Sequence, residues 1–350
     1  MTQTETRPKL SIVMPVFNNL PLVRVMIDGI LANDYTDYEL IVVDDGSDNE
    51  TWCTLQSYAT AVGNRPEVKV VHRGRDPKGA PTCRNVGFDM ARGDYVMFFD
   101  SDDYVTSTCL ATRVGELEKR PDLDFMVFPS GIYDERGFHT EAHLLTFGYP
   151  IYKDDLASFA GRWLPFVVWN NIYRTASLRH HGVRWDENLL SYQDADFNVS
   201  TLIAGMRYDY ARTMPDYGYR ITTVASVSKK TFSKEHFNSH AHSVRNMYDK
   251  VQAKYGHRYD RALFSGVCYL YNTLMTGEGL NRELATVLCE SIADKDPLRS
   301  RILKMCARLS HILEHIMPAK TARQLPMLPF LLGFRAMHRT KIKRLQRIGL

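Results

Sequence analysis

The chain has 350 residues, of which 44% are hydrophobic and 24% are charged, and its formal net charge is +4. This balance is typical of a globular protein and excludes a collagen, a disordered chain and a disulfide-rich miniprotein. No apolar run approaches the roughly 20 residues that a membrane-spanning helix needs, and the N-terminus lacks the apolar core of a signal peptide. We therefore expect a cytoplasmic protein whose six scattered cysteines stay reduced.

Strands and helices are expected to alternate over the first 130 residues. Apolar, β-branched runs predict strands at 10–17, 38–45, 68–73, 95–100 and 124–128. Helical spacing predicts helices at 20–32, 49–62 and 81–93. Apolar strands separated by helices are typical of a mainly parallel sheet covered on both faces, so an α/β fold is predicted.

The second half of the chain has a different pattern. Residues 131–192 are rich in loops and aromatic side chains, and a helix at 194–205 and one or two strands near 207–224 are expected. Four helices are then predicted, near 233–254, 259–276, 281–294 and 298–316, and the prolines at 318, 326 and 329 are expected to break the helical pattern beyond residue 317. The chain thus divides into an α/β domain at 1–230, a helical region at 231–317 and a tail at 318–350.

Acidic residues follow two of the predicted strands. Asp44 and Asp45 end the second strand, and Asp100, Asp102 and Asp103 follow the fourth. Taken singly, the first group also fits a turn and the second a helix N-cap. Parallel strands end at one edge of a sheet, where ligands bind, and carboxylates crowded there repel one another unless a cation compensates. The sequence therefore predicts a site for Mg²⁺ or Mn²⁺ near the DSDD segment.

Four motifs in order make a resemblance specific. They are MPVFNN (14–19), VVDDGSDN (42–49), RNVGFDMARGDYVMFFDSDD (84–103) and YQDADF (192–197). Over residues 9–230 the chain resembles the family 2 glycosyltransferases of the GT-A fold. The resemblance implies an inverting, Mn²⁺- or Mg²⁺-assisted transfer of a hexosyl or N-acetylhexosaminyl group. The donor would be a nucleotide-diphosphate sugar, with UDP as the expected nucleotide, and the acceptor a hydroxyl of a glycan or lipid-linked glycan.

The resemblance also implies roles for single residues. Those that would surround the nucleotide-sugar are Pro15, Val16, Phe17, Asp45, Arg84, Asn85, Asp100 and Ser101. Asp45 would bond the base, and Asp100 or Asp102 the ribose. Asp102 or Asp103 would hold the metal between the two phosphates.

The YQDADF motif supplies the expected catalytic base. Asp194 occupies the place of the base, while Gln193 stands where the family usually has Glu. Asp196 is the second candidate, and both acids also fit a plain helix N-terminus. Trp169 would either pack against an acceptor sugar or belong to the core, and Arg220 would lie near the diphosphate.

The last segment is strongly basic. Residues 318–350 carry eight Lys and Arg residues and no acid, whereas the rest has 36 basic and 40 acidic residues. Ile342, Leu345 and Ile348 are expected opposite the basic side chains of one amphipathic helix, after a short apolar run at 326–334. Such a tail suits the anionic inner face of the cell membrane, and the alternatives are a helix docked on the protein or a homodimer contact. Nucleic acid is not expected, because a binder would spread positive charge over a folded face.

Other functions remain as alternatives. A response-regulator receiver domain also pairs acids at strand ends, but it leaves the QDADF segment unexplained. A nucleotidyltransferase would need a glycine-rich phosphate loop near the N-terminus, and a dehydrogenase would need GxGxxG after the first strand, and neither is present. A non-catalytic relative that binds nucleotide-sugar or serves as a scaffold is the main alternative, because of Gln193. We expect the helical third to serve as an acceptor platform, a dimer surface or both.

Overall fold

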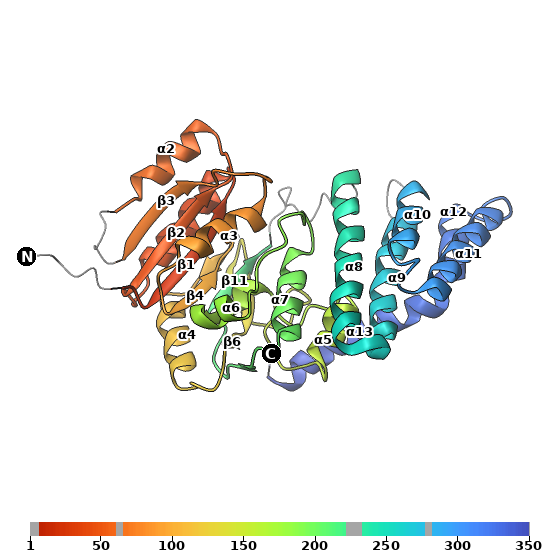
Figure 1. The fold of residues 1–350 in the computed structure, drawn as a ribbon. Coiled ribbons are helices and arrows are strands. Elements are labelled where there is room, and N and C mark those ends of the chain that lie inside the picture. The colour runs from red at the N-terminus through yellow and green to blue at the C-terminus, as the bar shows by residue number, and fades with distance from the viewer. Residues whose placement is uncertain (1–6, 61–65, 222–232, 277–281, 350) are drawn as a thin grey trace, which may run out of the picture. The chain divides into compact units, whose positions relative to one another are not determined.

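A computed structural model describes residues 7–60, 66–221, 233–276 and 282–349 of the protein (Figure 1). Contacts between residues group the chain into two compact units. The first unit comprises 1–150, 166–188 and 200–223, and the second comprises 151–165, 189–199 and 224–350. The second unit includes 151–165 and 189–199, so this grouping does not follow the single boundary that the sequence predicts at residue 230. That boundary stays a prediction.

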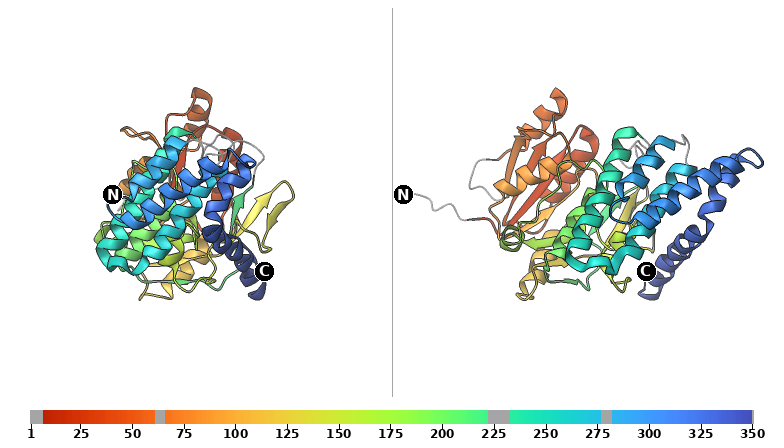
Figure 2. Two further views of the ribbon diagram at one scale, coloured as in Figure 1. Left: turned by 90° about the vertical axis from the view of Figure 1, so that its right-hand side faces the viewer. Right: turned by 45° about the vertical axis from the view of Figure 1, so that its right-hand side comes forward.

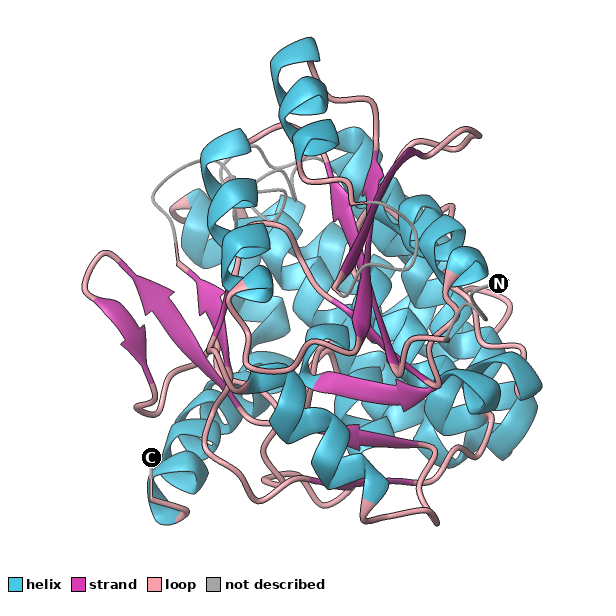
Figure 3. Cartoon of the chain, turned by 90° about the vertical axis from the view of Figure 1, so that its left-hand side faces the viewer, coloured by secondary structure: helices cyan, strands magenta, loops and turns pink. Residues whose placement is uncertain are grey.

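A seven-stranded sheet is the centre of the first unit (Figure 3). Its strands, in spatial order, are β10 (Tyr208–Tyr210), β6 (Phe125–Val127), β9 (Asn171–Arg174), β4 (Tyr95–Phe98), β1 (Leu10–Val16), β2 (Tyr38–Asp44) and β3 (Glu67–His72). Strands β1 to β4 are parallel, and only β9 runs antiparallel to its neighbours β4 and β6. The predicted α/β fold with a mainly parallel sheet is therefore confirmed.

Helices cover this sheet. They are α1 (Leu20–Leu31), α2 (Asn49–Ser57), α3 (Ala80–Met90), α4 (Cys109–Glu118) and α6 (Thr175–His180). Helix α2 begins where the Asp48 carboxylate accepts a hydrogen bond from the Thr51 amide, which satisfies one orphan donor of the first turn. Helix α3 packs so closely on the sheet that a Cβ at Gly87 would overlap the Val13 side chain of β1.

A second, smaller sheet belongs to the same unit. Its order is β5 (Tyr104–Val105), β11 (Tyr217–Arg220), β7 (Ser130–Asp134) and β8 (Gly137–His139). The sequence did not predict β7, β8 or β9, because each is at most five residues long; β7 and β9 are held by strands distant in sequence, and β8 forms a short hairpin with β7. β11 connects this small sheet to the DSDD segment, because Tyr217 and Arg220 of β11 donate hydrogen bonds to Asp103.

The second unit is helical. It holds α5 (Asp155–Ala160), the first residues of α7 (Gln193–Ile203), α8 (Lys234–Tyr255), α9 (Asp260–Thr276), α10 (Arg282–Ser291), α11 (Pro297–Leu313), α12 (Ala319–Gln324) and α13 (Leu328–Arg347), with single turns at η3 (Gly256–Tyr259) and η4 (Leu325–Met327). Helices α8 to α11 pack side by side (Figure 2). The helical C-terminal region is thereby confirmed.

The C-terminal segment differs from the expectation in two ways. Pro329 lies in the first turn of α13, where no amide donor is needed, so it begins a 20-residue helix and does not break one. Helix α13 packs against α9 and buries Lys341 together with Leu345, whereas Ile348 is 50% exposed. The predicted division into one apolar and one basic face is therefore wrong for this helix. The side chains of 330–339 lie outside the described residues.

None of the helices in the described ranges combines the length and apolar composition that crossing a bilayer requires. The eight basic residues of the tail are instead distributed over two helices. Among the described side chains, Lys320, Lys343 and Arg347 are exposed, while Arg344 is partly buried and donates to the Ile151 carbonyl.

Candidate active site

The C-terminal ends of β1, β2 and β4 lie at one edge of the large sheet. Val16 pairs with Asp44 across β1 and β2, and Val13 pairs with Phe98 across β1 and β4. Because these strands are parallel, the residues that follow each of them emerge on the same side. Asp45 and the DSDD segment therefore belong to one edge of the sheet.

The loop after β1 is tied to the loop after β2. The Asn18 amide donates to Ser47 Oγ at 2.8 Å, and Asn18 Oδ1 accepts from the Asp48 amide at 2.8 Å. Asn18 has φ 54°, a left-handed conformation that Asn tolerates better than most residues. Phe17, between this link and β1, is 50% exposed, and the Lys78 ammonium lies 3.7 Å from its ring centroid. A half-exposed aromatic ring with a cation over one of its faces therefore lies at this edge of the sheet.

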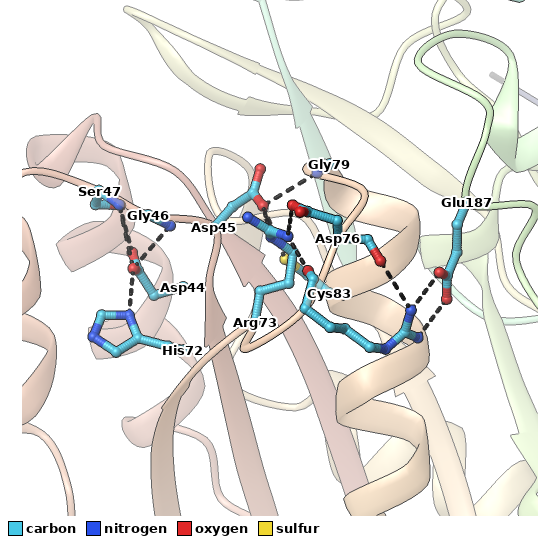
Figure 4. Close-up of polar contacts among 11 residues, drawn as sticks. Asp44, Asp45, Gly46, Ser47, His72, Arg73, Asp76, Gly79, Cys83 and Glu187 are labelled. Carbon is cyan, nitrogen blue, oxygen red and sulfur yellow. Dashed lines mark hydrogen bonds and ion pairs between the residues drawn. The ribbon is translucent and has the colours of Figure 1, made fainter.

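The two acids after β2 have different environments (Figure 4). Asp44 is fully buried, and its carboxylate contacts the His72 ring at 3.0 Å. Asp45 Oδ1 accepts from Arg73 Nε at 2.7 Å and from the Gly79 amide at 3.1 Å. Asp44 thus shapes the turn, while Asp45 joins the ends of β2 and β3 to the start of α3.

Arg84 and Asn85 stand side by side on α3 and act on different segments. The buried Arg84 guanidinium pairs with Asp100 and lies 4.4 Å from the centroid of the Trp185 ring. Asn85 Nδ2 donates to the Trp185 carbonyl at 3.0 Å and to Glu187 at 2.7 Å, and its Oδ1 accepts from the Trp185 amide. Arg84 therefore positions the first acid of DSDD, and Asn85 holds the segment 185–187 against α3.

The acids of DSDD are separated by their partners. Asp103 is buried, its Oδ1 accepts from the Arg220 amide and its Oδ2 from the Tyr217 hydroxyl, both at 2.8 Å. Burial and then the neighbouring acids raise the pKa of Asp103 well above its usual value. Asp102 is exposed to solvent. Desolvation by the surrounding protein atoms, and then the charge of Asp100, raise the pKa of Asp102 to about 6.

The remaining predicted residues of the nucleotide site contribute less through their side chains. Pro15 and Val16 are buried within β1, and the Val16 carbonyl accepts from the Asp45 amide at 2.8 Å. Ser101 is partly buried in the turn after β4. Pro15 and Val16 therefore bring the exposed Phe17 to the edge of the sheet but present no side chain there.

Some of the residues that support the site were missed by sequence reasoning, whereas Trp169 and Arg220 were named by it. Arg113 on α4 forms a buried ion pair with Asp216, with nitrogen–oxygen distances of 2.6 and 2.9 Å. This pair fixes the chain at the residue before β11, which begins with Tyr217.

Trp169 is 2% exposed and stacks on Tyr217 with ring centroids 4.7 Å apart, so it is a core residue and does not form an acceptor surface. Arg220 Nε donates to the Asp102 carbonyl at 2.7 Å and holds the DSDD turn.

One of the missed residues had a usable signal. Arg73 directly follows β3, and this position after a strand is the same feature that singled out Asp45. No sequence pattern points to Glu187, Asp216 or Tyr217, because each acts through a partner at least 100 positions away in the chain.

The described residues contain no group of three or more His, Cys, Asp or Glu side chains arranged to hold a metal ion. Mg²⁺ is commonly bound by only one or two carboxylates together with substrate phosphates, so a smaller set of acids is sufficient for such a site. Asp102 fits such a role, because it reaches solvent and its charged form is disfavoured by desolvation and then by the charge of Asp100, which a cation would compensate. Asp103 fits less well, because both of its oxygens already accept hydrogen bonds.

Asp194 belongs to the second unit, in the first turn of α7, and is partly buried. The preceding Tyr192 has φ 61°, and the Arg162 guanidinium lies 3.6 Å from its ring centroid. Its hydroxyl donates to the Phe159 carbonyl at 3.1 Å. Burial raises the pKa of Tyr192 to about 12. The start of α7 is thereby held in a conformation that non-glycine residues rarely adopt.

Asp196, the other candidate base, has a different environment. It is 1% exposed, and its two oxygens lie 2.7 and 2.8 Å from the Lys250 ammonium on α8. A carboxylate engaged in this way holds α7 against α8. It is poorly suited to accept a proton from a substrate, because both of its oxygens are already bonded to the ammonium.

Comparison with known proteins finds similar sequences. The family described as "Glycosyl transferase family 2" matches residues 11–182. The "Putative colanic acid biosynthesis glycosyl transferase WcaA" of Escherichia coli (strain K12) is 36% identical over 199 residues, which are 57% of this chain and 68% of that protein. For three further curated relatives, the chain spans between 33% and 72% of their length.

Solved structures share the fold. Staphylococcus aureus TarS 1–349 in complex with UDP-GlcNAc has a TM-score of 0.65 and 16% identity, over 94% of this chain and 92% of that one. The mannosyltransferase PcManGT from Pyrobaculum calidifontis, in complex with GDP-Man and Mn²⁺, has a TM-score of 0.51 and 17% identity, over 94% and 87% of the two chains. At these identities the likeness shows the fold alone.

Proposed function

The chain belongs to glycosyl transferase family 2 and has the GT-A fold, and on this premise we propose that it transfers a sugar from a nucleotide-diphosphate donor to a hydroxyl of an acceptor glycan. The observation that carries the proposal is the edge of the large sheet, where Asp45 follows β2 and Asp100 and Asp102 follow β4. Acids at such an edge can accept hydrogen bonds from the base and ribose of a nucleotide-sugar and can hold the cation that its anionic diphosphate needs.

The donor is proposed to bind along this edge. Phe17, whose side chain is half exposed, would stack on the base, and Asp45, which accepts from Arg73 through one oxygen, would accept from the base through the other. Asp100, oriented by Arg84, would bind the ribose. UDP is the proposed nucleotide, and a hexosyl or N-acetylhexosaminyl group the proposed sugar. The support is that the TarS structure with the same fold is a complex with UDP-GlcNAc.

Asp102 is the proposed ligand for Mn²⁺ or Mg²⁺, in preference to Asp103. The support is its exposure and its raised pKa, together with the hydrogen bonds that occupy both oxygens of Asp103. The PcManGT structure, which shares the fold, contains Mn²⁺. When bound, such a cation stabilises the negative charge that grows on the diphosphate leaving group. Arg220 holds the turn that carries Asp102, and so keeps the carboxylate in place.

Asp194 is the proposed general base. It would take the proton of the acceptor hydroxyl as that oxygen attacks the anomeric carbon, and a single displacement inverts the anomeric centre. The engagement of Asp196 by Lys250 supports this choice between the two acids of the motif. Gln193 does not remove the base, because the carboxylate at position 194 is present.

The acceptor is proposed to be a glycan or a lipid-linked glycan of a bacterial surface polysaccharide. This rests on the relatives, which include a putative colanic acid biosynthesis enzyme and a poly(ribitol-phosphate) β-N-acetylglucosaminyltransferase. The test is nucleotide release from a panel of UDP- and GDP-sugars, with and without Mn²⁺ and with mixed glycans as acceptors. Turnover of a UDP-sugar that depends on Mn²⁺ and acceptor is expected. Donor binding without any turnover would favour the alternative of a non-catalytic nucleotide-sugar-binding or scaffold protein.

We further propose that the protein associates peripherally with the anionic inner face of the membrane, and that α11 and the exposed basic residues of 318–350 carry this contact. The exposed apolar residues on and just after α11 are Leu298 (69%), Met305 (66%), Leu309 (47%), Ile312 (62%) and Ile316 (74%). Arg301 and Arg308 are exposed beside them, and α11 contains no acid. A symmetric contact between two copies would bring these cations together, so an anionic lipid surface fits the charge better than a second copy does.

Flotation with liposomes tests this location. The protein should float with vesicles that contain phosphatidylglycerol, less so with phosphatidylcholine alone, and Ile312→Glu should reduce flotation. Met214→Glu is the matched control, because Met214 is 75% exposed on the first unit. Equal flotation of both variants would contradict the proposal.

A further inference from the structure

The second unit contains a cavity that the proposed chemistry does not use. Its volume is about 670 Å³, within the usual range for ligand sites. Residues from α5, η3, α9 and α13, together with the segments directly before and after α5, line it. Three aromatic side chains contribute to the wall, namely Tyr152, Trp163 and Tyr259.

The charged groups of the lining are almost all cationic. They are Lys153, Arg258, Arg261, Lys341 and Arg344, with one acid, Asp154. The carboxylate of Asp154 is already engaged, because it accepts from the Ala157 amide at 2.9 Å and from the Tyr259 hydroxyl at 3.1 Å. The cavity therefore presents an excess of positive charge and favours an anion.

Lys341 is the most enclosed of these cations. It is 6% exposed, and this burial lowers its pKa to about 7. Arg344, one turn further along α13, is held at the wall by a hydrogen bond to the Ile151 carbonyl. An anion bound between them would favour the charged form of the lysine.

The rest of the lining suits a ring with both an apolar face and polar groups. Trp163 is 8% exposed and offers a flat apolar surface. The Tyr152 hydroxyl is buried and has no hydrogen-bond partner among the described residues. A buried hydroxyl without a partner is unfavourable, so a ligand oxygen that accepts from it would be stabilised.

We propose that this cavity binds a phosphate-bearing saccharide, and that this saccharide is part of the acceptor. The pyranose ring would pack on Trp163, and the phosphate would bind Lys341 and Arg344. The second half of the proposal rests on the proposed function. It is supported by a link through α5, which lines the cavity. Tyr192 directly precedes α7, the helix that carries the proposed base, and its hydroxyl donates to the carbonyl of Phe159 in α5.

Calorimetric titration of the full chain with N-acetylglucosamine 1-phosphate, under saturating UDP and Mn²⁺ to fill the donor site, tests the proposal. Lys341→Met, which keeps the length of the buried side chain, should weaken binding at least tenfold, and Tyr152→Phe should weaken it less. Lys343→Met is the matched control, because Lys343 is exposed on the same helix and does not line the cavity. Equal affinities of Lys341→Met and Lys343→Met would overturn the proposal.

Further arms identify the ligand chemistry. Inorganic phosphate, N-acetylglucosamine and glucuronic acid should each bind more weakly than the sugar phosphate, and inorganic phosphate binding as tightly would overturn the saccharide part. Titration with the sugar phosphate should change the tryptophan fluorescence, because the pyranose would pack on Trp163. Trp163→Phe should abolish this change while the circular dichroism spectrum stays native. Asp102→Asn separates the two proposals. It should lose Mn²⁺-dependent UDP binding but retain sugar-phosphate binding measured without UDP.

Discussion

The Tyr217 hydroxyl donates a 2.8 Å hydrogen bond to Asp103 Oδ2, and this bond divides the acids of the DSDD segment into two kinds. Asp103, held also by the Arg220 amide, ties the turn after β4 to β11. Asp102, one residue earlier, is left exposed. Two adjacent carboxylates of one motif therefore have different chemistry, and substitution of each should have a different effect.

Asp102→Asn should weaken Mn²⁺-dependent UDP binding by about tenfold or more, because a metal ligand is lost, while the thermal unfolding temperature does not fall, because the folded protein disfavours the charge that is removed. Asp103→Ala should mainly lower stability, by about 1–3 kcal/mol, because the Tyr217 hydroxyl and the Arg220 amide lose their acceptor, and it should weaken Mn²⁺-dependent UDP binding less than Asp102→Asn does. Calorimetry with and without Mn²⁺ and thermal denaturation measure the two effects. Loss of the metal response in Asp103→Ala alone would assign the cation to Asp103.

The affinity for Mn²⁺·UDP should fall as the pH is lowered below 6. The pKa of Asp102 is raised to about 6, so its carboxylate is charged above this pH and protonated below it, and the proton competes with the cation. At pH 5 the loss should be about tenfold, one decade per pH unit. Because the raised pKa disfavours the charged form, the cation-free protein should also lose stability as pH rises from about 4 to 6. Titrations between pH 5 and 8 check this, and an unchanged pH profile in Asp102→Asn would contradict it.

Asp194→Asn should reduce the turnover number by about 10²–10⁴-fold without changing the dissociation constant for UDP, because only the proton acceptor is removed. Asp196→Asn should retain catalysis but lower the free energy of unfolding by about 1–3 kcal/mol, since Lys250 loses a charged partner. Transfer kinetics and urea denaturation separate the two variants. Asp196→Asn inactive with normal stability would exchange the two roles.

Asp216→Asn should destabilise the first unit by about 3–5 kcal/mol, because it leaves the buried Arg113 guanidinium without its counter-charge. It should also weaken donor binding, because β11 carries Tyr217 and Arg220. Urea denaturation measures the first effect and UDP titration the second. Asp122→Asn is the control, as its ion pair with Arg120 is exposed and should matter little. An unchanged unfolding midpoint for Asp216→Asn would contradict this account.

Sequence reasoning succeeded where short-range rules decide the structure. Apolar runs of strand length predicted β1, β2, β3, β4 and β6 within a few residues, and helical periodicity predicted α8 to α11. The position of Asp45 and of DSDD after strands was enough to predict one sheet edge. It failed for the short strand β9, which lies between β4 and β6 because of pairing partners far away in the chain.

The same distinction applies to the candidate site. The order of the strands along the chain, the motif acids and their charge are properties of the sequence, because they depend on residues that are neighbours in the chain. Which acid is buried, as Asp103 is by Tyr217, and which cation is enclosed, as Lys341 is on α13, were decided only by tertiary structure. Exposure, hydrogen bonding and pKa depend on atoms brought close by folding from segments more than 100 residues apart, and no local pattern encodes those distances.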